Sequence, residues 1–423
     1  MRRQYASRLT RISASLPVQS GPRAGRHELI VLLAALMGLN SFAIDAMLPA
    51  LPAIGHSLGV ANDNDRQWVI VAYMMGFGST QLLWGPLSDR YGRKPILIVG
   101  VVLYALFALS CGVATSFPML VASRAAMGGA AAVTRVLVTA MIRDLFNAEA
   151  MARVLSLVSV VFMLMPMVAP SIGQLILLIA PWRAIFWALC AYAVAMSGWA
   201  LLRLPESLHE EYRRPLQAGI IGQAIAETLR DRLSLGYTLA MTLIMGGLVA
   251  YISSIQQIVF DVFHEPGEIG IVFAAIAVPM ALGSLVNSRI VERFGLRRVG
   301  HWGAIMFAVI TAVHALVAVS GRESLAAFVV MQALAMGSFA FSTSNFNTLA
   351  MTDMADIAGT ASAVQGVIMT IGGSLIGIAI GQAFDGTEVP FLIGMALSAV
   401  GSLIIVLITE RGRLLQPLVA TTA

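Results

Sequence analysis

The stretch Gly85-Pro86-Leu87-Ser88-Asp89-Arg90-Tyr91-Gly92-Arg93-Lys94-Pro95 joins two long apolar segments of the chain. Its glycines permit two helix ends to approach closely around a tight turn, because glycine has no Cβ atom. The aspartate and the basic residues can bridge neighbouring helix ends through charge-assisted bonds. A generic basic loop would explain the charge but not the Gly-Asp-Gly spacing, so the stretch indicates a specific connection between packed helices.

The composition around this stretch is typical of a membrane protein. Hydrophobic residues make up 58% of the chain, charged residues only 12%, and the mean hydropathy is +0.83. A membrane crossing needs about 20 mostly apolar residues. Twelve segments meet that requirement and predict an all-α membrane protein with twelve transmembrane helices: 29–51, 66–86, 96–115, 118–142, 151–179, 183–203, 234–259, 268–291, 300–319, 325–350, 359–384 and 390–408.

Positive charge is distributed unequally between the two sides of these spans. The side that holds the N-terminus carries 22 of the 27 Lys and Arg, including six Arg in residues 1–27, and the opposite side carries Arg66, Arg183 and Arg322. Because cytoplasmic loops collect positive charge, we expect both termini to be cytoplasmic in a bacterial inner membrane. Residues 1–27 have no short apolar core with a cleavage site and are expected to remain as a basic tail. The basic pI is then a sign of topology, and we expect no nucleic-acid partner.

The chain is internally repeated. The longest segment outside the spans divides them six and six, which predicts a tail (1–28), an N-terminal bundle (29–203), a cytoplasmic linker (204–233), a C-terminal bundle (234–410) and a second tail (411–423). Asp89 to Gly92 is echoed by Glu292 to Gly295, and Asp144 by Asp353. Two pseudo-symmetric six-helix bundles place a central site between them that opens alternately to each face. The linker could form a helix on the membrane surface or a solvated connection.

Three ionisable residues lie deep within the predicted spans: Asp45, Arg124 and Arg135. Such groups are costly at membrane depth and by default mark a proton or ligand site. The two arginines are eleven residues apart and share a helix face, which must point into the protein or a wet cavity. Alternatively, they cap carbonyl groups near the ends of the span.

No pattern for catalysis or metal binding is present. Cys111 and Cys190 lack metal-ligand spacing, and His314 is alone in its span, where a packed or partner-bonded histidine is expected. No nucleophile–base arrangement occurs. We therefore expect no enzyme activity, no cofactor and no metal site.

The loop around Asp89 resembles the signature loop of the major facilitator superfamily. In that family it latches the cytoplasmic side of the two halves, which implies a gate made of the residues Gly85, Asp89, Arg90, Gly92, Arg93 and Lys94. Arg124 matches an arginine that the superfamily associates with proton coupling, although Met127 stands where a glutamine usually follows. The resemblance implies proton coupling by Asp45 and Arg124, with Arg135 as a further buried charge in the cavity.

The fifth span is similar to the Gly/Pro-rich signature of the antiporter branch, through Pro166, Pro170 and Gly173. Ala169 and Gln174 depart from that signature, and a simple proline kink is the alternative. Four further pieces resemble drug exporters of the bicyclomycin/chloramphenicol-resistance (Bcr/CflA) type, over about residues 29–410: residues 44–52, 143–146, 182–186 and 204–208. Some drug exporters have an additional acid two turns before the residue matching Asp45, where this chain has Met37.

These features predict a monomeric inner-membrane drug:proton antiporter that works by alternating access. We expect Asp45 and Arg124 to line the cavity, Asp45 to load a proton from the periplasm, and proton and drug to occupy the site in turn. The two arginines and one acid sum to +1, which favours small, largely apolar compounds that are neutral, zwitterionic or anionic. Expected substrate contacts are Tyr73, Tyr251, Gln256 and Asn345. The alternatives are a carrier of the same fold for one metabolite or nutrient, and a non-transporting membrane sensor.

Overall fold

The computed structural model describes residues 25–146, 148–213 and 218–416, and these ranges are helical apart from short connections. Twelve helices in the described ranges have 20 or more residues. The first six are α2 (Arg26–Asp45), α4 (Trp68–Tyr91), α5 (Arg93–Gly112), α6 (Phe117–Leu145), α7 (Ala148–Ile179) and α8 (Arg183–Arg203). The last six are α10 (Arg232–Gln257), α11 (Ile269–Phe294), α12 (Leu296–Val319), α13 (Leu325–Ala350), α14 (Ala358–Gln382) and α15 (Val389–Thr409).

Ten stretches within the described ranges are long and apolar enough to cross a membrane. They are built around every long helix except α4 and α7. A bilayer offers no water to bond exposed backbone groups, so a helix that satisfies its own N–H and C=O groups suits such apolar sequence. The prediction of an all-α membrane fold is confirmed.

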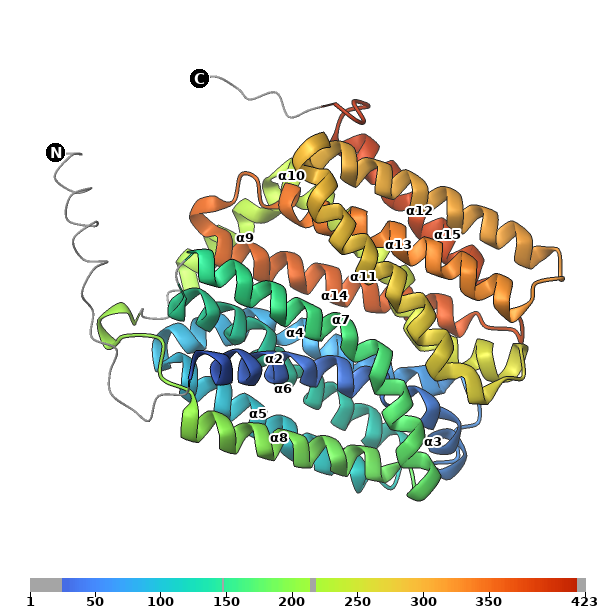
Figure 1. Ribbon diagram of the computed structural model, residues 1–423, viewed down its shortest axis with the longest axis horizontal. Helices are drawn as coiled ribbons and strands as arrows, with labels where there is room; N and C mark the ends of the chain where they lie inside the picture. Colours follow the sequence, from blue (N-terminus) through green and yellow to red (C-terminus); the bar gives the residue numbers. More distant parts are fainter. Residues whose placement is uncertain (1–24, 147, 214–217, 417–423) are drawn as a thin grey trace.

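The long helices pack as two bundles. In the N-terminal half α6 packs against α4 and α5, α5 against α8, and α2 against α7; in the C-terminal half α10 packs against α14 and α15, α12 against α13 and α15, and α11 against α13. The halves meet mainly through α4 with α14 and α7 with α11. Figure 1 shows the N-terminal half below and the C-terminal half above, with the helices running across the view.

Two short helices mark the two ends of the molecule. Helix α9 (Ala218–Arg230) lies at the left end in Figure 1 and α3 (Leu51–Ser57) at the right. We call these the α9 end and the α3 end. Helix α9 packs against α14 and α10 and buries Ala224 and Thr228, so the segment between the halves contains a helix docked on the C-terminal half.

Local chemistry sets where several helices begin. The side chains of Ser116, Asp231 and Ser324 accept hydrogen bonds from backbone N–H groups in the first turns of α6, α10 and α13. These caps satisfy donors that have no partner within the helix. Gly92, between α4 and α5, has a φ of 100°, a conformation that side chains with a Cβ rarely adopt. The glycine of the signature loop is therefore required by its backbone geometry.

The closest helix crossing in the N-terminal half joins α4 to α6. A Cβ atom added at Gly76 would lie 1.8 Å from the backbone oxygen of Ala125, and one added at Gly128 would lie 1.9 Å from that of Tyr73. Small residues let helix backbones approach in this way, and van der Waals packing drives association of membrane helices. This crossing fixes the positions of Tyr73 and Arg124 relative to each other.

Replacing Gly128 by Val should destabilise the N-terminal bundle. The side chain would have to displace the α4 backbone, and overpacking of this kind costs about 1–3 kcal/mol. We expect a lower midpoint of thermal unfolding for detergent-solubilised G128V, measured by size-exclusion chromatography after heating. Gly198→Val on α8 is the matched control, because nothing lies within 4 Å of an added Cβ there. Equal midpoints for the two variants would contradict the proposed close crossing.

Candidate functional site

Asp45 lies at the end of α2, where the two halves come together. Its side chain is only 3% exposed, and no described residue forms a hydrogen bond or ion pair with it. Tyr251 on α10, from the opposite half, lies within electrostatic reach of Asp45. The Tyr251 hydroxyl is also buried without a partner among the described residues, while its ring packs on Phe273. Two unsatisfied polar groups, one from each half, therefore lie near each other.

The α7 residues of the antiporter-like signature lie beside this site. A Cβ atom on Gly173 would be 2.1 Å from the backbone oxygen of Ala46, the residue that follows Asp45. Pro170 is buried in the same helix, and Pro166 belongs to α7 although its side chain lies outside the described part. Gly173 therefore allows α7 to pack directly on the chain segment that carries Asp45.

Arg124 is completely buried inside the N-terminal bundle. Its Nε donates to the backbone oxygen of Val69 at 2.8 Å, and one terminal nitrogen contacts the sulfur of Met127 at 3.8 Å. The guanidinium lies over the rings of Tyr73 (4.6 Å to the centroid) and Phe186 (5.9 Å). Ring faces attract a cation, most strongly where water is excluded. Its other terminal nitrogen has no partner among the described residues.

This arrangement differs from the expected pairing of Asp45 with Arg124. The structure shows no ion pair between these two residues, and Arg124 faces carbonyl, thioether and aromatic groups instead. Met127, at the usual position of a glutamine, supplies a weak sulfur acceptor in its place. The sequence indicated the cost of this charge but not the groups that would surround it.

Tyr73 connects Arg124 to α2. Its hydroxyl donates to Asn40 Oδ1 at 3.0 Å, Asn40 Nδ2 donates to Thr134 Oγ1 at 2.7 Å, and Thr134 donates to the backbone oxygen of Ala131. This buried chain joins α2, α4 and α6. In this conformation, the Tyr73 hydroxyl is thus engaged inside the bundle and does not face the seam between the halves.

Arg135 lies on the same helix as Arg124 but in a different environment. Its side chain is exposed to solvent although protein surrounds it, as expected for a group in a water-filled space between helices. It has no hydrogen-bond or ion-pair partner within the described residues. The shared helix face is therefore closed at Arg124 and open at Arg135.

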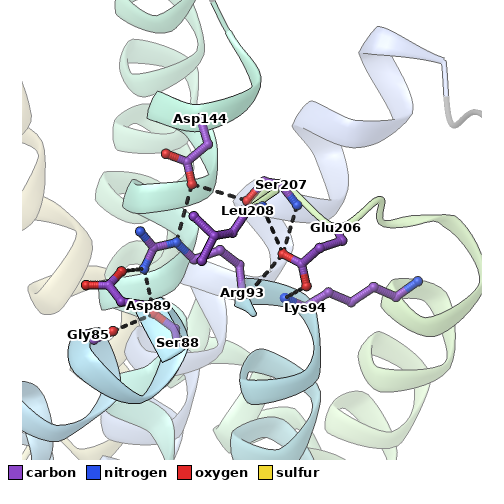
Figure 2. A network of polar contacts seen from close by, with 9 residues as sticks. All are labelled: Gly85, Ser88, Asp89, Arg93, Lys94, Asp144, Glu206, Ser207 and Leu208. Carbon is purple, nitrogen blue, oxygen red and sulfur yellow. Dashed lines mark hydrogen bonds and ion pairs between the residues drawn. The ribbon is translucent and has the colours of Figure 1, made fainter. Parts of the chain in front are cut away.

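The signature loop forms a charged network at the α9 end (Figure 2). The Arg93 guanidinium contacts Asp89 Oδ1 at 2.6 Å, Asp144 Oδ2 at 3.3 Å and Ser88 Oγ at 2.6 Å. Glu206 accepts the backbone N–H groups of Arg93 (2.9 Å) and Lys94 (3.2 Å), which ties the turn to the end of α8.

The rest of the loop supports this network. Ser88 Oγ donates to the backbone oxygen of Gly85, and Lys94 Nζ donates to that of Leu201. Arg90 lies over the ring of Tyr91 and is exposed. All these partners belong to the N-terminal half, so Asp89 does not bridge the halves in this conformation. The loop sequence indicated its own residues; it did not identify Glu206 and Asp144 as their partners.

The α3 end is bridged by amide side chains, which we call the amide clamp: Asn64, Gln67, Gln257 and Gln382. Gln67 Nε2 donates to Gln257 Oε1 (2.6 Å) and to the backbone oxygen of Gly381 (3.1 Å). Gln257 Nε2 donates to Asn64 Oδ1 at 2.9 Å, and Asn64 and Gln382 exchange bonds through their backbone oxygens. The clamp contains no charge and joins residues 190 to 318 positions apart.

Other bonds between the halves agree with this asymmetry. Gln81 donates to Thr370 near the middle of α4, Gln174 donates to the backbone oxygen of Pro266, and Arg66 lies 3.8 Å from Asp261. Every bond between the halves whose two partners are described lies at the α3 end or the middle. The halves are thus held together at the α3 end and are not bridged in this way at the α9 end.

Three polar residues of the C-terminal half complete the comparison with the sequence. Gln256 is fully buried, and neither of its amide atoms has a partner within the described residues. Asn345 is engaged: its Nδ2 donates to Asn287 Oδ1 and to the backbone oxygen of Phe341, both at 2.7 Å. His314 contacts Glu323 Oε1 at 2.8 Å and is thus a partner-bonded histidine.

Two packed bundles of apolar helices, with buried charges and polar networks at both ends of their seam, define the class of multi-span membrane transporters. The profile of the Major Facilitator Superfamily matches residues 33–377. The chain belongs to this superfamily. The sequence-based assignment to the superfamily and to its bicyclomycin-resistance type is confirmed.

Individual relatives agree with this assignment. The chain is 33% identical over 268 residues to a bicyclomycin resistance protein homolog of Haemophilus influenzae, covering 63% of this chain and 67% of that protein. It is 29% identical over 260 residues to the multidrug resistance protein MdtL of Escherichia coli, covering 59% of this chain and 65% of MdtL. The crystal structure of a D-xylose–proton symporter superimposes with a TM-score of 0.69 at 15% identity, covering 89% of this chain and 96% of the symporter, which shows the shared fold.

Replacing Glu206 by Gln should weaken the network at the α9 end. Glu206 accepts four backbone N–H groups with its two oxygens, and an amide would turn an NH₂ group toward one or more of them. Such loss costs about 1–3 kcal/mol, so the midpoint of thermal unfolding should fall. Glu210→Gln is the control, because the Glu210 side chain is 88% exposed. If both variants melt at the wild-type temperature, Glu206 does not hold the turn.

Proposed function

We propose that this protein is a proton-coupled multidrug exporter of the bacterial inner membrane that works by alternating access. Both termini and the α9 end face the cytoplasm in this proposal, in agreement with the excess of Lys and Arg on that side. The printed functions of two relatives, bicyclomycin resistance and multidrug resistance, support export of small drug-like compounds. The protein works as a monomer with the lipid bilayer as its surroundings, and its substrates are small, largely apolar, neutral or weakly charged molecules.

The observation that carries this proposal is the position of Asp45. An enclosed carboxyl group without a hydrogen-bond partner has unsatisfied polar atoms, which are costly in a dry environment. A proton, or a donor group of a substrate, would satisfy it. Because Asp45 lies at the seam, a shift of the C-terminal half would move Tyr251 and change access to it. Proton and drug can therefore use the site in alternation.

Arg124 supports the same site from within the N-terminal bundle. Its guanidinium is fixed on Tyr73, and Tyr73 bonds Asn40 on α2, the helix that ends at Asp45. A change at Asp45 can thus reach Arg124 through α2 and Tyr73. We assign proton binding to Asp45 and a positioning role to Arg124.

The polar systems at the two ends supply the gates. In the conformation described here the amide clamp holds the α3 end closed. In the opposite conformation the clamp would separate, and Asp89 would turn from Arg93 toward the C-terminal half, whose helix N-termini favour a negative charge. Pro166, Pro170 and Gly173 on α7 would accommodate the rearrangement beside Asp45. The cycle exchanges bonds at one end for bonds at the other.

Asp45→Asn should abolish substrate-driven proton release. Inverted membrane vesicles would be energised, loaded with a pH-quenched dye, and exposed to a panel of chemically unrelated drugs. We expect dequenching by several drugs in the wild type and none in D45N. Glu265→Gln, an exposed acid at the α3 end, should behave as the wild type.

Silence of the wild type across the panel, with an intact proton gradient, would contradict multidrug antiport and favour a carrier for one metabolite. Unchanged release in D45N would remove Asp45 from the coupling step while leaving drug export intact. The two components of the proposal can therefore fail separately.

Gln257→Leu should shift the conformational equilibrium toward an open α3 end. Leucine leaves Gln67 and Asn64 without their shared partner, and about 1–2 kcal/mol would change the ratio of conformations by a factor of roughly 5–30. Spin labels at His56 and Glu265, exposed on opposite halves, would report a larger population of long distances, after Cys111 and Cys190 are replaced. Gln332→Leu, whose Nε2 contacts only Met395 within one half, is the control. Identical distance distributions for both variants would exclude the clamp as a gate.

A further inference from the structure

The part of α6 that approaches the α9 end has an exposed polar face. Arg135, Thr139 and Arg143 are exposed and spaced at i, i+4 and i+8, so they lie in one row along the helix. The residues between them on either side are mostly buried. Neither arginine forms a hydrogen bond or ion pair through its side chain with any described residue. We call this row the α6 polar row.

The α6 polar row extends well below the end of the helix. With a rise of about 1.5 Å per residue, Arg135 lies about 15 Å from Leu145, the last residue of α6. An unpaired arginine at that depth would be costly against lipid. Arg135 is nevertheless surrounded by protein and accessible to solvent. The row therefore faces water between the bundles and not the lipid.

The internal repeat places a matching row on α13. At the offset of 209 residues, Arg135, Thr139 and Arg143 correspond to Ser344, Thr348 and Thr352, all three of which are exposed. Helices α6 and α13 both lie outside the main interface, which α4, α14, α7 and α11 form. Equivalent helices of the two halves thus present equivalent rows toward the space between them.

The two rows differ in charge. The α13 row contains hydroxyl groups, and those of Thr348 and Thr352 donate to backbone oxygens of their own helix. The α6 row contains two guanidinium groups with no carboxylate partner in the described part of the chain, while nearby Asp144 is taken by Arg93. The wall of the space is therefore positive on one side and neutral on the other.

We propose that the α6 polar row binds the negatively charged group of the substrate, so that the exporter prefers small apolar compounds that carry one carboxylate. The planar guanidinium of Arg135 can hold a carboxylate through two parallel hydrogen bonds. Arg143, nearer the α9 end, attracts the anion toward Arg135, and the hydroxyl row of α13 adapts to the rest of the molecule. This inference rests on the proposed function as an exporter and specifies its substrate class.

The test measures binding by the purified full-length protein and requires no proton gradient. Each ligand of the panel is an arylcarboxylic acid paired with its own primary amide, which has nearly the same shape but no charge. Tetraphenylphosphonium serves as a permanent cation. Quenching of tryptophan fluorescence reports the dissociation constants for the wild type, Arg135→Gln, Arg135→Lys and Arg322→Gln. Arg322 is exposed at the α3 end and serves as the charge-matched control.

The wild type should bind each acid at least about tenfold more tightly than its amide. R135Q should lose this preference and keep its affinity for the amides, which also shows that it is folded. R135K should retain part of the preference, and R322Q all of it. Equal affinity of the wild type for acid and amide, tighter binding of tetraphenylphosphonium than of the acids, failure to bind any acid, or an unchanged preference in R135Q would overturn the inference.

The result is separable from that of the proposed function. If acids bind with the expected preference but release no protons from inverted vesicles, the charge preference stands and proton-coupled export fails. If unrelated neutral drugs release protons and R135Q behaves as the wild type in both measurements, export stands and the α6 polar row is not the site of recognition.

Discussion

The exclusion of water from the hydrocarbon layer is the constraint on which the rest of this structure depends. It forces the backbone into helices, and it forces each ionisable side chain to be enclosed, paired or placed in a wet space. The N-terminal bundle meets this requirement in three ways. Arg124 is enclosed by ring faces and a carbonyl group, Arg135 reaches water between the bundles, and Asp45 stays buried at the seam without a partner.

The two ends of the seam use different chemistry. At the α9 end, charged residues form a network inside one half, organised around Arg93 and Glu206. At the α3 end, uncharged amides join the two halves. Amide bonds across a separable interface avoid the cost of stripping water from charges each time the interface forms. A charged network that remains within one half can change its partner without unfolding its own turn, because Glu206 holds the backbone separately.

Close backbone contacts place these groups precisely. Gly128 brings α6 against α4 near Tyr73 and Arg124, Gly173 brings α7 against Ala46, and Gly381 leaves room for the amide of Gln67. In membranes such packing replaces the hydrophobic driving force that operates in water. The glycines therefore control the geometry of the site although they carry no functional group.

The sequence by itself determined the class of the molecule. Hydropathy gave the helices, the repeat gave the two halves, and the loop from Gly85 to Pro95 together with Asp45 and Arg124 indicated the superfamily and the costly charges. These features are local or strictly periodic, so they can be recognised without knowing contacts. Only the tertiary structure decided that Arg124 faces Tyr73 and not Asp45, that Glu206 anchors the loop, and that Asn64, Gln67, Gln257 and Gln382 form one clamp. Those pairings join residues tens to hundreds of positions apart, and they follow from helix packing, which fixes side-chain neighbours that no local pattern encodes.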